Sequence, residues 1–188
     1  MKTYDFCRIV VEGVTDKAFL EGVLKSLGID IHANGYKDTL RIDTTGELKG
    51  GGTISGGWTA LPERLKNIAK DVVKAPGKKL LILVIFDADD AQKDPRDGGY
   101  AKRLNALVTK SKSVPELASV DINIQYFLFP DNNKDGDLET VLSGTVKREH
   151  KDIIDCCWQG FVSCVQPKHR PDGKPYNLPT VKSQMKEY

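Results

Sequence analysis

The feature that most constrains the fold is the stretch at residues 80–90, which reads LLILVIFDADD. Its first seven residues are all apolar, which is typical of a strand buried on both faces, although so short a run does not by itself distinguish strand from helix. A strand with no polar face belongs inside a parallel sheet that helices cover on both sides. The stretch therefore predicts the central strand of an α/β protein.

Three aspartates, Asp87, Asp89 and Asp90, follow that strand at once. The carboxyl ends of parallel strands are where open α/β sheets bind ligands. If the tip stays strand-like, Asp87 and Asp89 point the same way, because side chains repeat every two residues. Carboxylates held that close repel one another unless a cation or proton lies between them, and Mg²⁺ is a hard ion that prefers oxygen ligands. The alternative is a solvated acidic turn after a buried strand.

The rest of the chain alternates between strand and helix patterns. Thr15 is a plausible N-cap for the first helix, and Gly28 would end it. Residues 46–57 form a glycine-rich stretch without a Walker pattern, which favours a linker over a phosphate-binding loop. The predicted strands are residues 6–11, 40–42, 80–86 and 122–129, and the predicted helices are residues 16–27, 59–73, 100–111 and 138–142. In the helix at residues 59–73, helical spacing predicts five inward positions: Leu61, Leu65, Ile68, Ala69 and Val72. This order predicts a parallel sheet with right-handed crossovers and helices on both faces.

Length and composition are those of one soluble domain with a small appendage. The chain has 188 residues, of which 39% are hydrophobic and 29% charged, and its formal net charge is +2. We expect a domain at residues 1–145 and a helical and extended appendage at residues 146–188, with a helix near residues 148–165 and another after about residue 180. No apolar run reaches the roughly 20 residues that span a bilayer, and no signal peptide is evident, so a cytoplasmic protein is expected.

The even charge balance does not favour a strongly basic nucleic-acid binder, although the tail after residue 147 carries more basic than acidic residues. The four cysteines form no C-x-x-C pair and fit no zinc pattern, so buried thiols are expected.

Three elements line up with a known domain: Glu12-Gly13 after the first strand, Asp87-x-Asp89 about 70 residues later after another, and the α/β frame between them. In the segments VVEGVTDKAFL and VIFDADD the chain resembles a TOPRIM domain, the fold shared by topoisomerases, bacterial primases, OLD-family nucleases and a recombination mediator. It is most similar to the stand-alone and OLD-type members. The resemblance covers roughly residues 5–145.

The resemblance implies a metal site. Glu12, Asp87 and Asp89 would be the catalytic residues and would hold one Mg²⁺ or Mn²⁺; alternatively, Glu12 acts as general acid or base while the aspartates hold the metal. Asp16, Asp137 and Glu139 occupy the places of further acids in OLD-like members and would complete a second metal site. For Asp16 and Asp137, a helix cap or a solvated turn is an equal alternative. Two OLD features are missing: no ATPase domain is found, and the C-terminal nuclease lysine is not placed, with Lys134 and Lys147 as candidates by proximity.

The expected function is a Mg²⁺-dependent nuclease or related phosphodiester-transfer enzyme that acts on nucleic acid, with DNA ahead of RNA. The chain could also form a homo-oligomer or bind a partner protein. The alternative is a non-catalytic module that binds metal or nucleic acid within a defence or repair system. A third reading is a phosphatase or phosphotransferase with Asp87 as nucleophile, although that chemistry usually places its Asp-x-Asp pair on the first strand. A topoisomerase is disfavoured, because no tyrosine lies in an identifiable strand-breaking module.

Overall fold

The computed structural model describes residues 3–33, 36, 39–46, 48–49, 52–53, 56–74, 77–92 and 94–145, with isolated residues between 159 and 174. It divides into two units, Met1–Asp137 and Leu138–Tyr188, each of which is described by itself. The helix predicted near residues 148–165 lies largely outside the described residues, and the one predicted after residue 180 lies wholly outside them. Among the described residues, no helix is long and apolar enough to cross a membrane.

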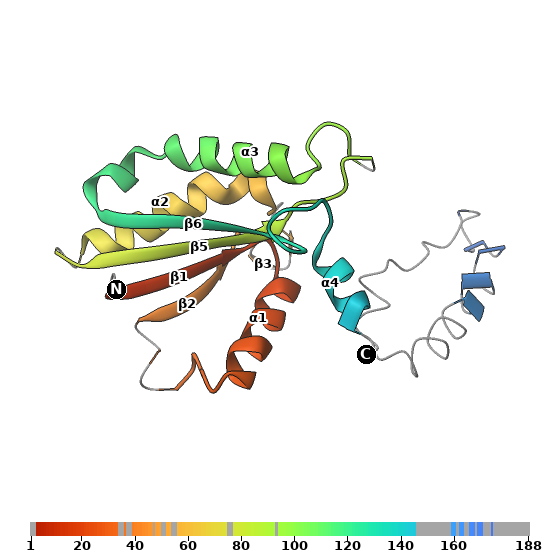
Figure 1. The fold of residues 1–188 in the computed structure, drawn as a ribbon, viewed down its shortest axis with the longest axis horizontal. Coiled ribbons are helices and arrows are strands. Elements are labelled where there is room, and N and C mark those ends of the chain that lie inside the picture. The colour runs from red at the N-terminus through yellow and green to blue at the C-terminus, as the bar shows by residue number, and fades with distance from the viewer. Residues whose placement is uncertain are drawn as a thin grey trace. The chain divides into compact units, whose positions relative to one another are not determined.

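A four-stranded parallel sheet lies at the centre of the first unit (Figure 1). Its strands are β1 (Phe6–Val11), β2 (Leu40–Thr44), β5 (Lys79–Asp87) and β6 (Asp121–Phe129), in the order β2-β1-β5-β6. All three strand pairs are parallel, and β5 lies inside the sheet between β1 and β6. The prediction of an α/β fold around residues 80–86 is therefore confirmed. The glycine-rich stretch also holds a short antiparallel pair, β3 (Leu48–Lys49) and β4 (Gly52–Thr53), which was not predicted.

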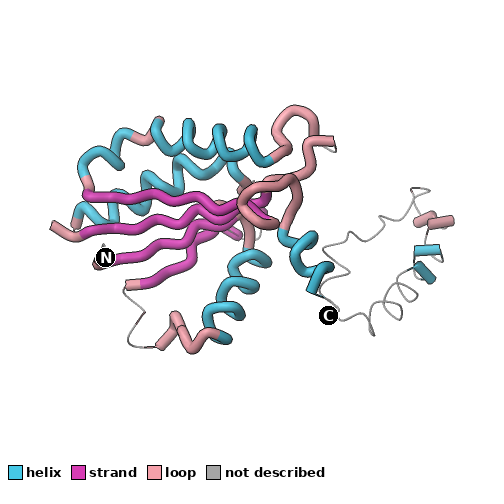
Figure 2. Tube along the Cα trace, in the orientation of Figure 1, coloured by secondary structure: helices cyan, strands magenta, loops and turns pink. Residues whose placement is uncertain are grey.

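Helices cover both faces of this sheet, as Figures 1 and 2 show. Helix α1 (Val14–Ser26) lies on one face, and α2 (Leu61–Val73) and α3 (Tyr100–Lys112) lie on the other. Two short 3₁₀ helices, η1 (Trp58–Ala60) and η2 (Pro115–Ser119), precede α2 and follow α3. The second unit begins with α4 (Leu138–Thr145), which continues past the predicted end at residue 142.

Side-chain alternation along the strands builds one core on each face. On the α2 side, β5 contributes four almost completely buried residues, which pack with the inward positions predicted for α2: Leu80, Ile82, Val84 and Phe86 from β5, and Leu61, Leu65, Ile68, Ala69 and Val72 from α2. On the α1 side, Ile9 and Val11 pack with Ile42 and Ile31. The prediction that this strand is buried on both faces is confirmed on the α2 side and only in part on the α1 side. Leu83 and Ile85 are only half-buried, because the core on the α1 side is centred on β1 and β2.

The start of α1 differs from the prediction. The helix begins at Val14 after an extended Gly13, so Thr15 lies inside it and is not the N-cap. The Asp16 carboxylate instead accepts a hydrogen bond from the Gly13 N–H at 2.8 Å, which satisfies a backbone donor that the helix leaves open. The predicted end of the helix is confirmed, since Gly28 follows with φ +80°.

Candidate acidic site at the carboxyl end of the sheet

Glu12 and Asp87 lie at the same edge of the sheet. Strand β1 ends at Val11, which pairs with Ile85 of the parallel strand β5, so Glu12 follows one strand where Asp87 ends its neighbour. The two carboxylates are close enough that the charge of Asp87 acts on Glu12, and the charges of Asp89 and Asp16 act on it as well. The structure thus brings Glu12 and Asp87 to one edge of the sheet, whereas the role of these acids as metal ligands stays a prediction. We call this region the carboxyl edge.

The backbone of Glu12 is fixed by the loop after β2. Its carbonyl accepts hydrogen bonds from the Gly46 N–H and from the Thr45 hydroxyl, both at 3.1 Å. The side chain of Glu12 has an atom without such support: within the described part of the chain, the buried Oε1 atom has no hydrogen-bond partner. A buried carboxylate oxygen without a donor is costly, so this atom is suited either to carry a proton or to face a cation.

The pKa of Glu12 reflects that environment. Burial is the main cause that raises it, the Asp87 carboxylate raises it further, and the Arg103 guanidinium opposes the rise, leaving a pKa of about 8. Without a cation, the Glu12 side chain is therefore largely protonated at neutral pH. A divalent cation beside it would favour the ionised form.

The chain leaves the strand direction directly after Asp87. Asp89 has φ 58°, a left-handed conformation that aspartate tolerates better than most residues. Its carbonyl accepts from the Gly136 N–H at 3.0 Å, which ties the end of β5 to the loop after β6. The predicted strand-like tip is therefore wrong, and the alternation that would align Asp87 with Asp89 does not apply. Burial raises the pKa of Asp89; Arg103 opposes this, while Asp137 and Asp94 add to it.

Sequence reasoning missed the residue that pairs with Asp89. Arg103 of α3 is 2% exposed, and its Nη2 atom donates to the Asp89 Oδ2 atom. Its guanidinium lies 5.1 Å from the centroid of the Trp58 ring, and Lys110 Nζ lies 4.8 Å from the same centroid. One signal could have found it: Arg103 precedes the buried Leu107 and Ser111 by four and eight residues, which places it on the inward face of the helix.

The other predicted site residues differ in their positions. Asp16 is 6% exposed and caps α1, as its structural alternative predicted. Asp137 follows Gly136, and its charge acts on Asp89. Glu139 lies in the first turn of α4, in the second unit, so its role stays a prediction. Lys134 forms an ion pair with Asp131 at 3.1 Å, and Lys147 lies outside the described residues.

The donor chemistry of the carboxyl edge fits Mg²⁺, since carboxylate oxygens are its usual protein ligands and Glu12 Oε1 has no donor. Its present arrangement is not a finished metal site. Among the residues that the structure describes, no group of three or more His, Cys, Asp or Glu side chains is arranged to hold a metal ion. Cation binding would thus require side-chain rotation and a looser Asp89–Arg103 pair.

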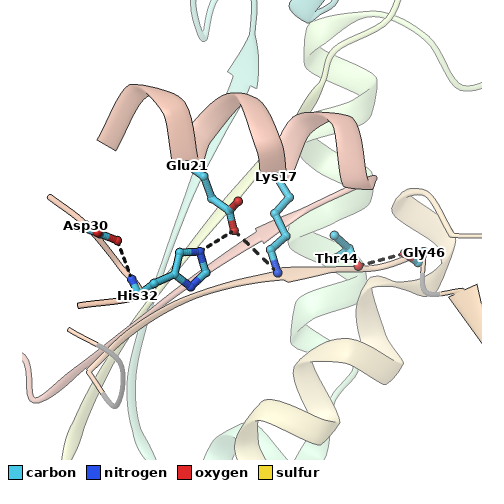
Figure 3. A network of polar contacts seen from close by, with 6 residues as sticks. All are labelled: Lys17, Glu21, Asp30, His32, Thr44 and Gly46. Atoms are coloured by element: carbon cyan, nitrogen blue, oxygen red, sulfur yellow. Dashed lines mark hydrogen bonds and ion pairs between the residues drawn. The ribbon is translucent and has the colours of Figure 1, made fainter. Parts of the chain in front are cut away.

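A second polar region lies between α1 and the edge strand β2, which flanks β1 on the side away from β5 (Figure 3). Glu21 lies between Lys17 Nζ, at 3.9 Å, and His32 Nε2, at 3.8 Å. These residues line a pocket of about 320 Å³ together with Arg41 and Asp43. Charges of both signs face it and its lysine and histidine contact Glu21, so the pocket favours no ligand charge.

Residues 7–181 match a protein-family model whose description is "Protein of unknown function (DUF3226)". Comparison with curated proteins and with solved structures gives no match.

Proposed function

The chain belongs to the DUF3226 family, whose description leaves its function open, and we propose that it is a Mg²⁺-dependent nuclease or related phosphodiester-transfer enzyme with a TOPRIM-type acidic site. One observation carries the proposal: acids from separate segments meet at the carboxyl edge, around a buried glutamate oxygen that lacks a hydrogen-bond donor in the described part of the chain. Ligand sites of open α/β sheets occur at this edge.

Each residue has a distinct part in this proposal. Glu12, Asp87 and Asp89 would hold Mg²⁺ or Mn²⁺, with Asp16 and Asp137 as candidates for a second ion. The bound ion would stabilise negative charge on the phosphodiester oxygens. Alternatively, the aspartates alone hold the ion, and Glu12, whose pKa without a cation is about 8, exchanges a proton with the attacking or leaving oxygen at neutral pH. The substrate class is nucleic acid, with DNA ahead of RNA.

The test compares Asp89→Asn with the wild type on labelled single- and double-stranded DNA and RNA, with Mg²⁺, with Mn²⁺ and with chelator. We expect cleavage that needs the metal and that Asp89→Asn reduces by at least about a hundredfold, since it removes a ligand charge from the site. Asp121→Asn is the matched control, because Asp121 is exposed and begins β6 at the opposite end of the sheet. Equal cleavage by Asp89→Asn and wild type would rule out this role for the carboxyl edge.

A non-catalytic module is the second candidate, and one observation favours it: Asp89 already has an internal cationic partner in Arg103. Such a module would bind divalent metal or nucleic acid without turnover. Calorimetry of Mn²⁺ binding alongside the cleavage assay separates the two, because metal binding without cleavage of any substrate would identify the module.

A further inference from the structure

Arg103 places a positive charge where a metal ion is proposed to bind. The guanidinium is buried, and burying a charge is unfavourable unless it is paired. Its Nη2 atom is paired with Asp89, whereas its Nε and Nη1 atoms are buried with no hydrogen-bond partner among the described residues. The arginine thus depends on one carboxylate, which is itself 42% exposed at the carboxyl edge.

The guanidinium of Arg103 also lies over the ring of Trp58. A guanidinium over an indole face is attracted by the ring quadrupole, and Arg103 lies within the range of that interaction. The glycine-rich segment fixes the approach of Trp58: a Cβ on Gly56 would lie 2.4 Å from the Gly46 Cα, so only glycine allows these two backbones to meet there. Trp58, Arg103 and Asp89 therefore form a continuous chain of contacts from η1 to the carboxyl edge.

If the Asp89 carboxylate binds Arg103 and a divalent ion together, the two cations repel each other. A divalent ion bound to its free oxygen would lie roughly 6 Å from the guanidinium, where even water-like screening leaves a repulsion that weakens ion binding about tenfold. Arg103 also supplies in advance the charge compensation that a metal would otherwise provide.

We propose that Arg103 is the internal counter-ion of the carboxyl edge, that it competes with a divalent cation for Asp89, and that Trp58 senses the exchange. The inference rests on the metal site of the proposed function and deepens it by giving that site a built-in electrostatic regulator. When a cation binds Asp89, the Asp89–Arg103 pair loosens and the guanidinium shifts against the indole ring. Arg103 is a positioning residue in this account, because it acts through Asp89.

The experiment uses the full chain with Trp158→Phe, which leaves Trp58 as the single tryptophan. Mn²⁺ affinity is measured by electron paramagnetic resonance, and Trp58 emission is followed during Mg²⁺ titration. We expect Arg103→Met to bind Mn²⁺ about tenfold more tightly and Arg103→Lys to fall between it and the wild type. Mg²⁺ should shift Trp58 emission when Arg103 is present and leave it unchanged in Arg103→Met.

Two controls separate this effect from general charge and from the indole signal. Lys102→Met removes the same formal charge from an exposed neighbour on α3, whose Nζ donates to the Pro95 carbonyl, and should change Mn²⁺ affinity by less than about twofold. Lys110→Met removes the other cation over Trp58 and should keep the Mg²⁺-dependent emission shift. Urea unfolding of each variant establishes that it is folded. If Arg103→Met does not fold, Arg103→Lys tests the proposal in its place, provided that its Trp58 emission without metal equals that of the wild type.

Mn²⁺ binding to wild type with equal or weaker binding to folded Arg103→Met would overturn the competition and leave the proposed metal site intact. Binding to Arg103→Met alone would support competition in its strongest form. Binding to neither protein would sink both the metal site and the competition.

Discussion

Glu12 is the residue at which burial and charge oppose each other most strongly. An ordinary glutamate pKa is 4.5, and in the fold it is raised to about 8, first by burial and then by Asp87. Between these two pH values the folded chain keeps a proton that the unfolded chain has released. The free energy of unfolding therefore falls as pH rises through this window, and this destabilisation is complete above about pH 8.

Replacing Glu12 with glutamine should remove that pH dependence, because the amide cannot ionise. Between about pH 6 and about pH 8 the wild type should lose about 2 kcal/mol relative to Glu12→Gln. Urea unfolding at both pH values, in metal-free buffer, measures the difference. Glu63→Gln is the matched control, since Glu63 is exposed in the first turn of α2 and should follow the wild type. Parallel pH profiles for wild type and Glu12→Gln would show that Glu12 is ionised in the fold at neutral pH.

The residue scale is also where sequence reasoning failed. The alternation of β5 predicts that Asp89 continues the strand, whereas Asp89 has a left-handed conformation and its carbonyl accepts a hydrogen bond from the N–H of Gly136, about 50 residues later. A contact that distant leaves no trace in a local pattern. The residue type of Arg103 does not reveal its burial, because basic residues on helices are usually solvated, although its spacing from Leu107 places it on the inward face. Tertiary pairing therefore decided both positions.

Whole elements were easier to predict, because periodicity is a local signal that burial enforces. The five inward positions expected in α2 are all buried, and β1 has its predicted limits. The exposure of the α1-side face of β5 was not predictable in the same way, since it depends on where a helix from another part of the chain packs.

Two glycines, one in a helix and one in a loop, should change the stability of the fold in opposite directions when replaced by alanine. Gly22 lies in α1 with open space around it, so Gly22→Ala should stabilise the fold by about 0.5 to 1 kcal/mol through helix propensity. Gly56 lies against Gly46, so Gly56→Ala must move the backbone beside Glu12 and should destabilise by more than about 1 kcal/mol. Urea unfolding measures both. A neutral Gly56→Ala would mean that the glycine-rich segment does not press against the loop after β2.

At the scale of the whole molecule, parallel topology is what assembles the site. Neighbouring parallel strands bring their carboxyl ends to one edge of the sheet, so acids that are far apart in the sequence come together there without a local sequence pattern that pairs them. That much was predictable from the order of strands and helices. How the assembled charges are balanced was not, because the balance depends on side chains that reach the edge from α3 and on burial that only the complete fold creates.

This coupling predicts how metal binding should affect the stability of the folded chain. A cation at the carboxyl edge must displace the proton from Glu12, which costs binding free energy below pH 8 and none well above it. Since a ligand that binds only the folded state stabilises it, Mg²⁺ should raise the melting temperature more at about pH 8.5 than at about pH 6. In Glu12→Gln the difference between the two pH values should disappear, and Asp89→Asn should weaken the stabilisation at both. Thermal unfolding with Mg²⁺, compared with NaCl at matched ionic strength, measures it. A Mg²⁺ effect that NaCl reproduces would reflect screening of the clustered carboxylates and would count against a specific ion site.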